Sequence, residues 1–130
     1  MGDEFRAVAA AGSRRAAVNA DAMFPHRWTD EGVAVQCDFT GAHLLHLSAA
    51  ACVLNDVYRE AAACGVVLDG VVVSATGGFD PETWASTGIT YAVEIDSPSP
   101  ETDVAGLIAR VDEVAEIPRA LRAGLGVRRR

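Results

Sequence analysis

One segment restricts the fold of this chain more than any other. The run from Leu44 to Cys64 contains neither glycine nor proline and is dense in alanine, and Gly65 follows it as an expected C-cap. Alanine is the best helix former, and no run of β-branched residues opposes it here. At about 1.5 Å per residue, the run predicts a helix roughly 30 Å long. Its first half is apolar on nearly every side, so other parts of the protein are expected to bury it.

Hydrophobic alternation predicts strands before and after this helix. The clearest case places Val33, Val35, Cys37 and Phe39 on one face of a strand within residues 32–39. Two short strands separated by a turn near Gly12 are expected within residues 5–20, the second running through residues 16–18. Two longer strands are expected after the helix, at residues 66–76 and 88–96, with the glycine pair at 77–78 ending the first of them.

A second helix is predicted near the C-terminus. Ser99 is the expected N-cap and Pro100 the first helical residue, and Pro118 interrupts the pattern. The helix carries one apolar stripe, formed by Val104, Leu107, Ile108, Val111, Val114 and Ala115. The order strands, long helix, strands, helix fits a single domain over residues 1–130. Because one small sheet cannot cover every apolar side of the long helix, we expect a symmetric homodimer.

Composition argues against several partners. The net charge of −7 disfavours nucleic acid and anionic membranes, which both require a basic surface. The longest apolar runs, such as Leu47 to Leu54, are far shorter than the roughly 20 residues that span a bilayer. The three cysteines form no CxxC pair, and the start Met1 to Arg6 is charged rather than signal-like. We therefore expect a cytoplasmic protein without metal or cofactor.

Polar residues recur along the long helix at helical spacing. Ser48, Cys52, Asn55 and Arg59 form a stripe on an otherwise apolar rod. Such groups need partners when buried, so the stripe is expected to face a cleft or a polar network. The alternative is that Ser48 and Cys52 are small packing residues and the other two are exposed.

Cys52 is the candidate reactive residue. It lies in the middle of the predicted helix, so activation by a helix N-terminus is not expected, and a reactive thiolate would need a nearby cation. The candidate cations are Arg14, Arg15, His26, Arg27 and Arg59.

His43 and His46 are spaced to lie on one helix face, but no third metal ligand is evident. The alternative is that His43 reaches solvent and His46 forms an internal hydrogen bond. These two residues alone are weak support for a metal site.

Several motifs resemble those of the OsmC/Ohr family. They are the small-residue helix segment Leu47 to Cys52, the following phrase Leu68-Asp69-Gly70-Val71, and the closing segment from Glu116 to Gly124. The likeness extends from about Phe39 to Gly124.

The resemblance implies an α+β fold, with antiparallel strands around one long central helix and a second C-terminal helix. It also implies an intertwined homodimer with active sites at the subunit interface. The implied activity is that of a thiol peroxidase acting on organic hydroperoxides, and Cys52 matches the attacking cysteine.

Two positions depart from the family pattern. Ile117 stands where the resolving cysteine is expected, and Ala42 stands where Ohr-type members carry a glutamate. The arginine that would hold that glutamate corresponds to Arg14 or Arg15, so this clamp is incomplete.

Three functions therefore stay open. One is a one-cysteine hydroperoxide reductase, with Cys52 and Arg15 as catalytic residues and an external thiol as reductant. Another is a non-redox binding protein or an enzyme of specialised metabolism, whose interface pocket takes a small organic molecule. The residues expected to line that site are Ser48, Asn55, Arg14, His26, Trp28 and Ile117. The last is a structural dimer without a ligand.

Overall fold

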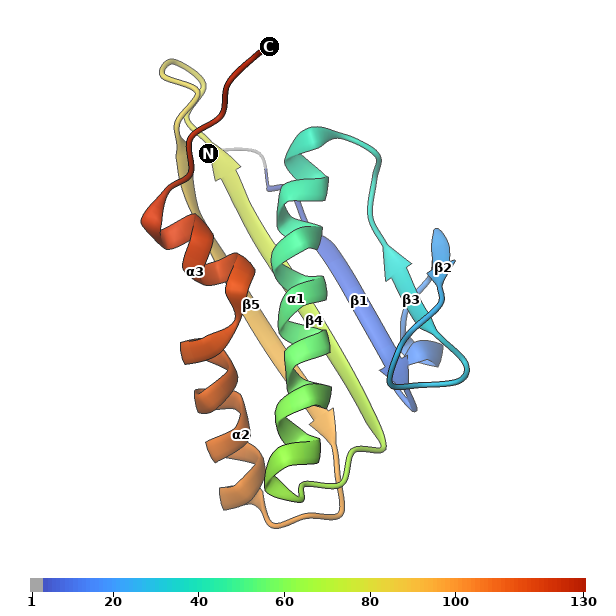
Figure 1. Cartoon of the computed structure of the whole chain (residues 1–130). Helices are drawn as coiled ribbons and strands as arrows, with labels where there is room; N and C mark the ends of the chain where they lie inside the picture. The colour runs from blue at the N-terminus through green and yellow to red at the C-terminus, as the bar shows by residue number, and fades with distance from the viewer. Residues whose placement is uncertain (1–3) are drawn as a thin grey trace.

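The computed structural model describes residues 4–130, so Met1 to Asp3 of the charged N-terminal segment lie outside it. The described chain forms one five-stranded sheet in which every neighbouring pair is antiparallel (Figure 1). The α+β class expected from the sequence is confirmed. In spatial order the strands are β2 (Ala22–Phe24), β3 (Val33–Gln36), β1 (Ala7–Gly12), β4 (Gly70–Phe79) and β5 (Ser86–Asp96).

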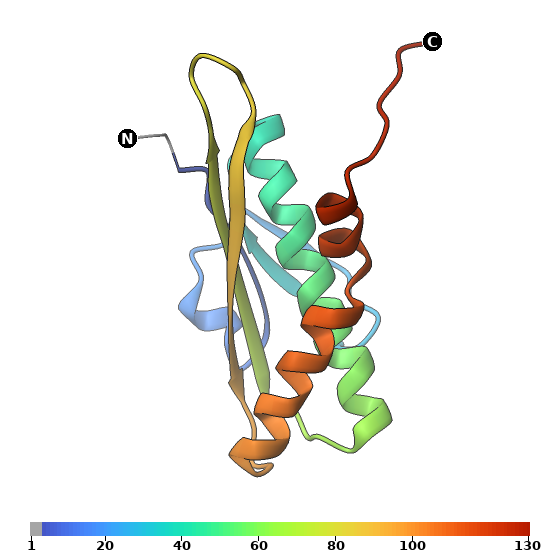
Figure 2. The same cartoon turned by 90° about the vertical axis from the view of Figure 1, so that its left-hand side faces the viewer.

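Three helices lie on one face of the sheet: α1 (Gly41–Cys64), α2 (Glu101–Val114) and α3 (Glu116–Ala123). Figure 2 shows them on one side, with the short 3₁₀ segment η1 (Arg15–Ala17) on the other. The long helix is confirmed but begins earlier than expected, because the Thr40 side chain accepts the His43 N–H at 3.0 Å and caps it. It ends at Gly65, whose φ of 74° is left-handed, as predicted.

Some sequence-based strand limits are wrong. Residues 16–18 form no strand, because the chain turns into η1 directly after β1. β3 ends at Gln36, which leaves Phe39 91% exposed, whereas Cys37 packs against the core. β4 begins only at Gly70 and continues through the glycine pair to Phe79. These glycines do not end the strand, because Gly77 pairs with Ile89 of β5.

The helix predictions also need corrections. Pro100, not Ser99, is the N-cap of α2, since the Ser99 hydroxyl instead accepts the Val67 N–H at 3.0 Å. Asp56, a charged residue in the more polar second half of α1, is only 3% exposed, because α3 covers this turn of α1. The apolar stripe of α2 is confirmed at Leu107 and Val111, which are buried.

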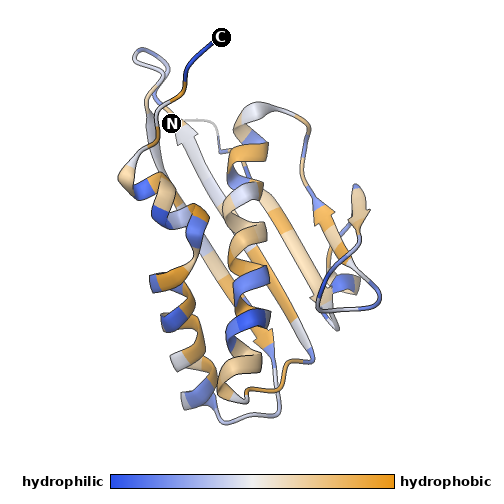
Figure 3. Cartoon of the chain, in the orientation of Figure 1, coloured by the Kyte–Doolittle hydropathy of each residue, from blue (hydrophilic) through white to orange (hydrophobic). Residues whose placement is uncertain are grey.

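One continuous hydrophobic core joins the sheet to the helices (Figure 3). Alanines of β1 lie opposite α1 and allow the helix to approach the sheet closely. The inner face of β5 matches the predicted alternation. That face consists of Ile89, Tyr91, Val93 and Ile95.

The N-terminal half of α1 is less covered. Leu44, Leu45 and Leu47 are only half-buried within one chain. The predicted homodimer would cover part of this half of the helix, and it stays a prediction. Within residues 4–130, none of the helices combines the length and the hydrophobicity that crossing a bilayer requires.

Candidate functional site

The Cys52 thiol lies where α1 meets the start of α3. It is half-buried, and its sulfur is 3.9 Å from Asp56 Oδ2, one helical turn away on α1. Its distance to Glu116 Oε2, on α3, is also 3.9 Å. The S–H group can therefore donate to either carboxylate. The thiol thus has two proton acceptors beside it.

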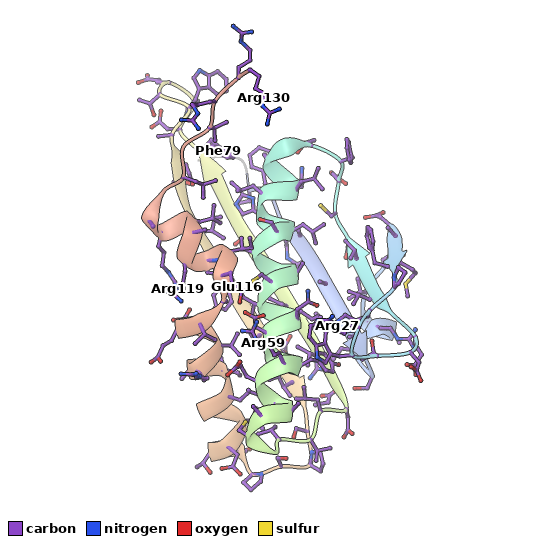
Figure 4. All side chains as sticks on the ribbon, viewed as in Figure 1. Arg27, Arg59, Phe79, Glu116, Arg119 and Arg130 are labelled. Carbon is purple, nitrogen blue, oxygen red and sulfur yellow. The ribbon has the colours of Figure 1, made fainter. Side chains whose placement is uncertain are left out.

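Arg59 holds these two carboxylates together. Its Nη1 is 3.1 Å from Asp56 Oδ1 and 3.0 Å from Glu116 Oε1. Figure 4 shows Arg59 and Glu116 next to each other beside α1. The Asp56 side chain is 4% exposed, so its charge needs this counterion. Cys52, Asp56, Arg59 and Glu116 are called the thiol cluster below.

The N-terminus of α3 also points at the thiol. The chain leaves α2 at Val114, and Ala115 serves as the N-cap of α3. The backbone N–H groups of Ile117 and Glu116 face the Cys52 sulfur and lower its pKa. The sequence-based exclusion of a helix N-terminus was wrong, because it considered only the helix that carries Cys52.

The net effect on the thiol is nevertheless to keep it protonated. Burial, the largest cause, raises the pKa of Cys52 above its ordinary value, and the charges of Asp56 and Glu116 raise it further. Burial also raises the pKa of Asp56, while Arg59 opposes that change. A buried carboxylate with a raised pKa is a stronger base, which suits proton removal from a neighbouring thiol.

The two arginines expected near Cys52 lie elsewhere in this chain. Arg14 makes a bidentate pair with Asp96 at the end of β5, with both N–O distances at 2.9 Å. Arg15 lies in η1 near Met23 and Ala34, on the sheet face opposite α1, and its Nε has no hydrogen-bond partner among the described residues. Within one chain, Arg59 is the cation at the thiol cluster.

The predicted polar stripe divides between two flanks of α1. Cys52 and Arg59 face α3, whereas Asn55 faces the loop between β2 and β3 and contacts His26. Ser48 is used locally, since its hydroxyl donates to the Leu45 carbonyl at 2.6 Å. The expected binding residues therefore lie apart: His26, Trp28 and Asn55 meet on one flank, and Ile117 lies on the other.

The described residues give little support for a metal site. His46 is fully buried and its Nδ1 donates to the Ala42 carbonyl at 2.6 Å, while His43 Nδ1 contacts Thr40, so the two do not converge on a site. Among residues 4–130, one group has ligand atoms within 4.8 Å of one another: Cys52, Asp56 and Glu116. Arg59 already neutralises both of its carboxylates. This arrangement favours an ion pair over a metal centre.

Sequence reasoning missed Glu116 and Asp56 as members of the site. Glu116 directly precedes Ile117, which the family resemblance matched to the second cysteine, and Asp56 follows Cys52 by one helical turn. Both of these spacings can be seen in the sequence. They place the two carboxylates beside the thiol only because α3 packs across α1.

The fold and the cysteine on its central helix define an OsmC-like protein. The model of the family described as OsmC-like protein matches residues 34–128, and the chain belongs to this family. Among curated proteins, no significant match is found.

Two solved structures show the same fold. An OsmC-like hydroperoxide resistance protein from Jannaschia sp. CCS1 is 12% identical with a TM-score of 0.63, covering 97% of this chain and 91% of that one. An OsmC-like protein from Mycoplasma pneumoniae is 16% identical with a TM-score of 0.59, covering 94% of this chain and 87% of that one.

Proposed function

We propose that this protein reduces organic hydroperoxides through the Cys52 thiol, with an external thiol as reductant. The observation that carries the proposal is the thiol cluster itself. A thiol, two proton-accepting carboxylates and an arginine converge on the central helix of a chain related to a hydroperoxide resistance protein. Arg59 and Glu116 form an ion pair beside the thiol, although Ala42 occupies the family's glutamate position.

The reaction begins with loss of the thiol proton. Asp56 or Glu116 accepts it, and the thiolate attacks one peroxide oxygen. The S–O bond forms as the O–O bond breaks, and the departing alkoxide takes up the proton and leaves as an alcohol. Cys52 is thereby oxidised to sulfenic acid while the peroxide is reduced. The α3 amides and Arg59 stabilise the negative charge of the thiolate and of the departing alkoxide.

An external thiol then restores the enzyme. Because Ile117 replaces the resolving cysteine, the sulfenic acid condenses with a small thiol to give a mixed disulfide and water. A second thiol molecule releases Cys52 and leaves as part of a disulfide. In the described residues all three cysteines are free, which agrees with a cycle that uses no internal disulfide.

We also propose that two copies of the chain associate through the half-buried face of α1. Leu44 and Leu45 leave apolar area there that association would bury. A cytoplasmic location fits a cycle that depends on a reducing thiol pool. In such a dimer Arg14 or Arg15 of a second copy is the remaining candidate for a further cation at the thiol.

Turnover is the direct test of this function. Purified protein is mixed with cumene hydroperoxide and dithiothreitol, and peroxide loss is followed with time. We expect many peroxides consumed per protein molecule, at a rate that depends on the dithiothreitol concentration. Protein that is folded but consumes no more peroxide than buffer would contradict the proposal.

Replacing Glu116 with glutamine separates two roles of this carboxylate. Removing its negative charge should lower the pKa of Cys52, because Glu116 raises it in the wild type. The same change removes one proton acceptor, so peroxide reduction should slow by about tenfold, with Asp56 retaining part of the role. The pKa is measured from the pH dependence of Cys52 alkylation by iodoacetamide.

The matched control for this variant is Glu113→Gln, which removes an acidic residue from the exposed surface of α2. It should change neither the alkylation profile nor turnover. If Glu116→Gln lowers the thiol pKa but turns over as fast as wild type or faster, then Glu116 is not a base in the reaction.

A further inference from the structure

A concave site lies on the flank of α1 opposite the thiol cluster. It is a cavity of about 350 Å³ between α1 and the segment that joins β2 to β3. Its walls are largely apolar, with Phe24 and Trp28 on one side and Leu47 and Leu54 of α1 on the other. Figure 4 shows Arg27 on one side of α1 and Arg59 with Glu116 on the other. The cavity is therefore separate from the site proposed for peroxide reduction.

A chain of hydrogen bonds fixes one polar group at this cavity. His26 Nδ1 is 2.7 Å from Thr29 Oγ1, and its Nε2–H donates to Asn55 Oδ1 at 3.0 Å. The rings of Trp28 and Tyr58 hold the imidazole, with centroids 5.4 and 5.3 Å away. Because Oδ1 accepts from His26, the two N–H donors of the Asn55 amide have no partner within residues 4–130. Asn55 lines the cavity, so these donors are available to a ligand.

The positively charged side chain of Arg27 lies at the same cavity. The Arg27 guanidinium lies 5.8 Å from the centre of the Trp28 ring and lines the cavity. In the described part of the chain no carboxylate lies within 4.0 Å of it, whereas Arg14, Arg59, Arg110 and Arg122 all have such partners. Arg27 lines a largely apolar cavity and has no counterion among the described residues, so it can pair with an anionic ligand group there.

We propose that this cavity binds a small apolar monocarboxylate. The carboxylate accepts hydrogen bonds from Arg27 and from the Asn55 amide, and the hydrocarbon body packs against Phe24, Leu47 and Leu54. A neutral ligand would leave Arg27 without a partner, and a strongly polar one would leave the apolar walls unmatched. The proposal does not depend on Cys52 and holds whether or not the protein reduces peroxides.

Octanoate and 1-octanol are the matched probes, since they share a chain length and differ in charge. The chain contains two tryptophans, so Trp84→Phe leaves Trp28 as the single fluorescent reporter at the cavity. Titrations in this background should show saturable binding of octanoate, with a dissociation constant about tenfold below that of octanol. Adding Arg27→Gln should remove that preference while leaving octanol binding unchanged. Adding Arg119→Gln instead, on exposed α3, should preserve it.

Three results would overturn the proposal. One is no saturable change in Trp28 emission with octanoate. Another is equal binding of octanoate and octanol to the Trp84→Phe protein. The last is an octanoate preference that survives Arg27→Gln. Circular dichroism of each variant establishes that the comparison is made between folded proteins.

Discussion

Replacing Cys52 with serine is expected to abolish hydroperoxide reduction. Serine keeps the size of the side chain but lacks the nucleophilic sulfur that forms the S–O bond. We expect the rate of cumene hydroperoxide consumption to fall by at least about a hundredfold, to the level of buffer with dithiothreitol. The Cys52 side chain is half-buried and makes only long contacts with its carboxylate neighbours, so this variant should fold normally.

The remaining cysteines provide the matched controls. Cys64 is exposed at the end of α1, and the Cys37 thiol donates to the Asp38 carbonyl at 3.2 Å. Serine at either position should leave turnover close to that of wild type. Turnover that survives Cys52→Ser, or that is lost in Cys64→Ser, would show that the chemistry lies elsewhere.

Replacing Gly77 with alanine is expected to cause a large loss of stability. A Cβ at Gly77 would lie 2.2 Å from the Gly88 carbonyl oxygen and 2.4 Å from His46 Nε2. The first of these is backbone of the paired strand β5, and His46 is fully buried and hydrogen-bonded to Ala42. Neither the Gly88 backbone nor the His46 side chain can move without losing its own contacts. We therefore expect the free energy of unfolding to fall by about 2–3 kcal/mol. For a chain of this size that corresponds to a Tm lower by about 10 °C.

The same substitution at Gly106 is the control. Gly106 lies in α2, where an added Cβ meets nothing within 4 Å. Alanine is the better helix former, so Gly106→Ala should stabilise the protein by about 0.5–1 kcal/mol. Thermal denaturation followed by circular dichroism measures both variants. A Gly77→Ala protein as stable as wild type would contradict the packing of His46 against β4.

The long helix was predictable because its signals are local. Alanine content, the absence of glycine and proline, and a C-cap glycine are all read within the segment itself. Strand limits were less predictable, since pairing decides them. Gly77 and Gly78 resemble a turn in the sequence, yet β4 continues through them because β5 pairs alongside and His46 requires the space of a missing side chain.

The candidate site was predictable only in part. Cys52 could be selected from helical spacing and family resemblance, but its environment depends on how α3 crosses α1. The sequence shows Asp56 as a charged residue that ought to face solvent, and only the Arg59 pairing and the cover from α3 explain its burial. The split between Cys52 and Asn55 likewise follows from what packs on each flank, which helical spacing does not specify.

The central claim is that a hydroperoxide oxidises Cys52 to sulfenic acid. The protein is treated with one equivalent of cumene hydroperoxide in the presence of dimedone, which traps sulfenic acids, and is then digested for peptide mass spectrometry. We expect the dimedone adduct on the peptide that contains Cys52, with Cys37 and Cys64 unmodified. An adduct confined to Cys37 or Cys64, or peroxide that remains unconsumed with Cys52 still reduced, would contradict the account.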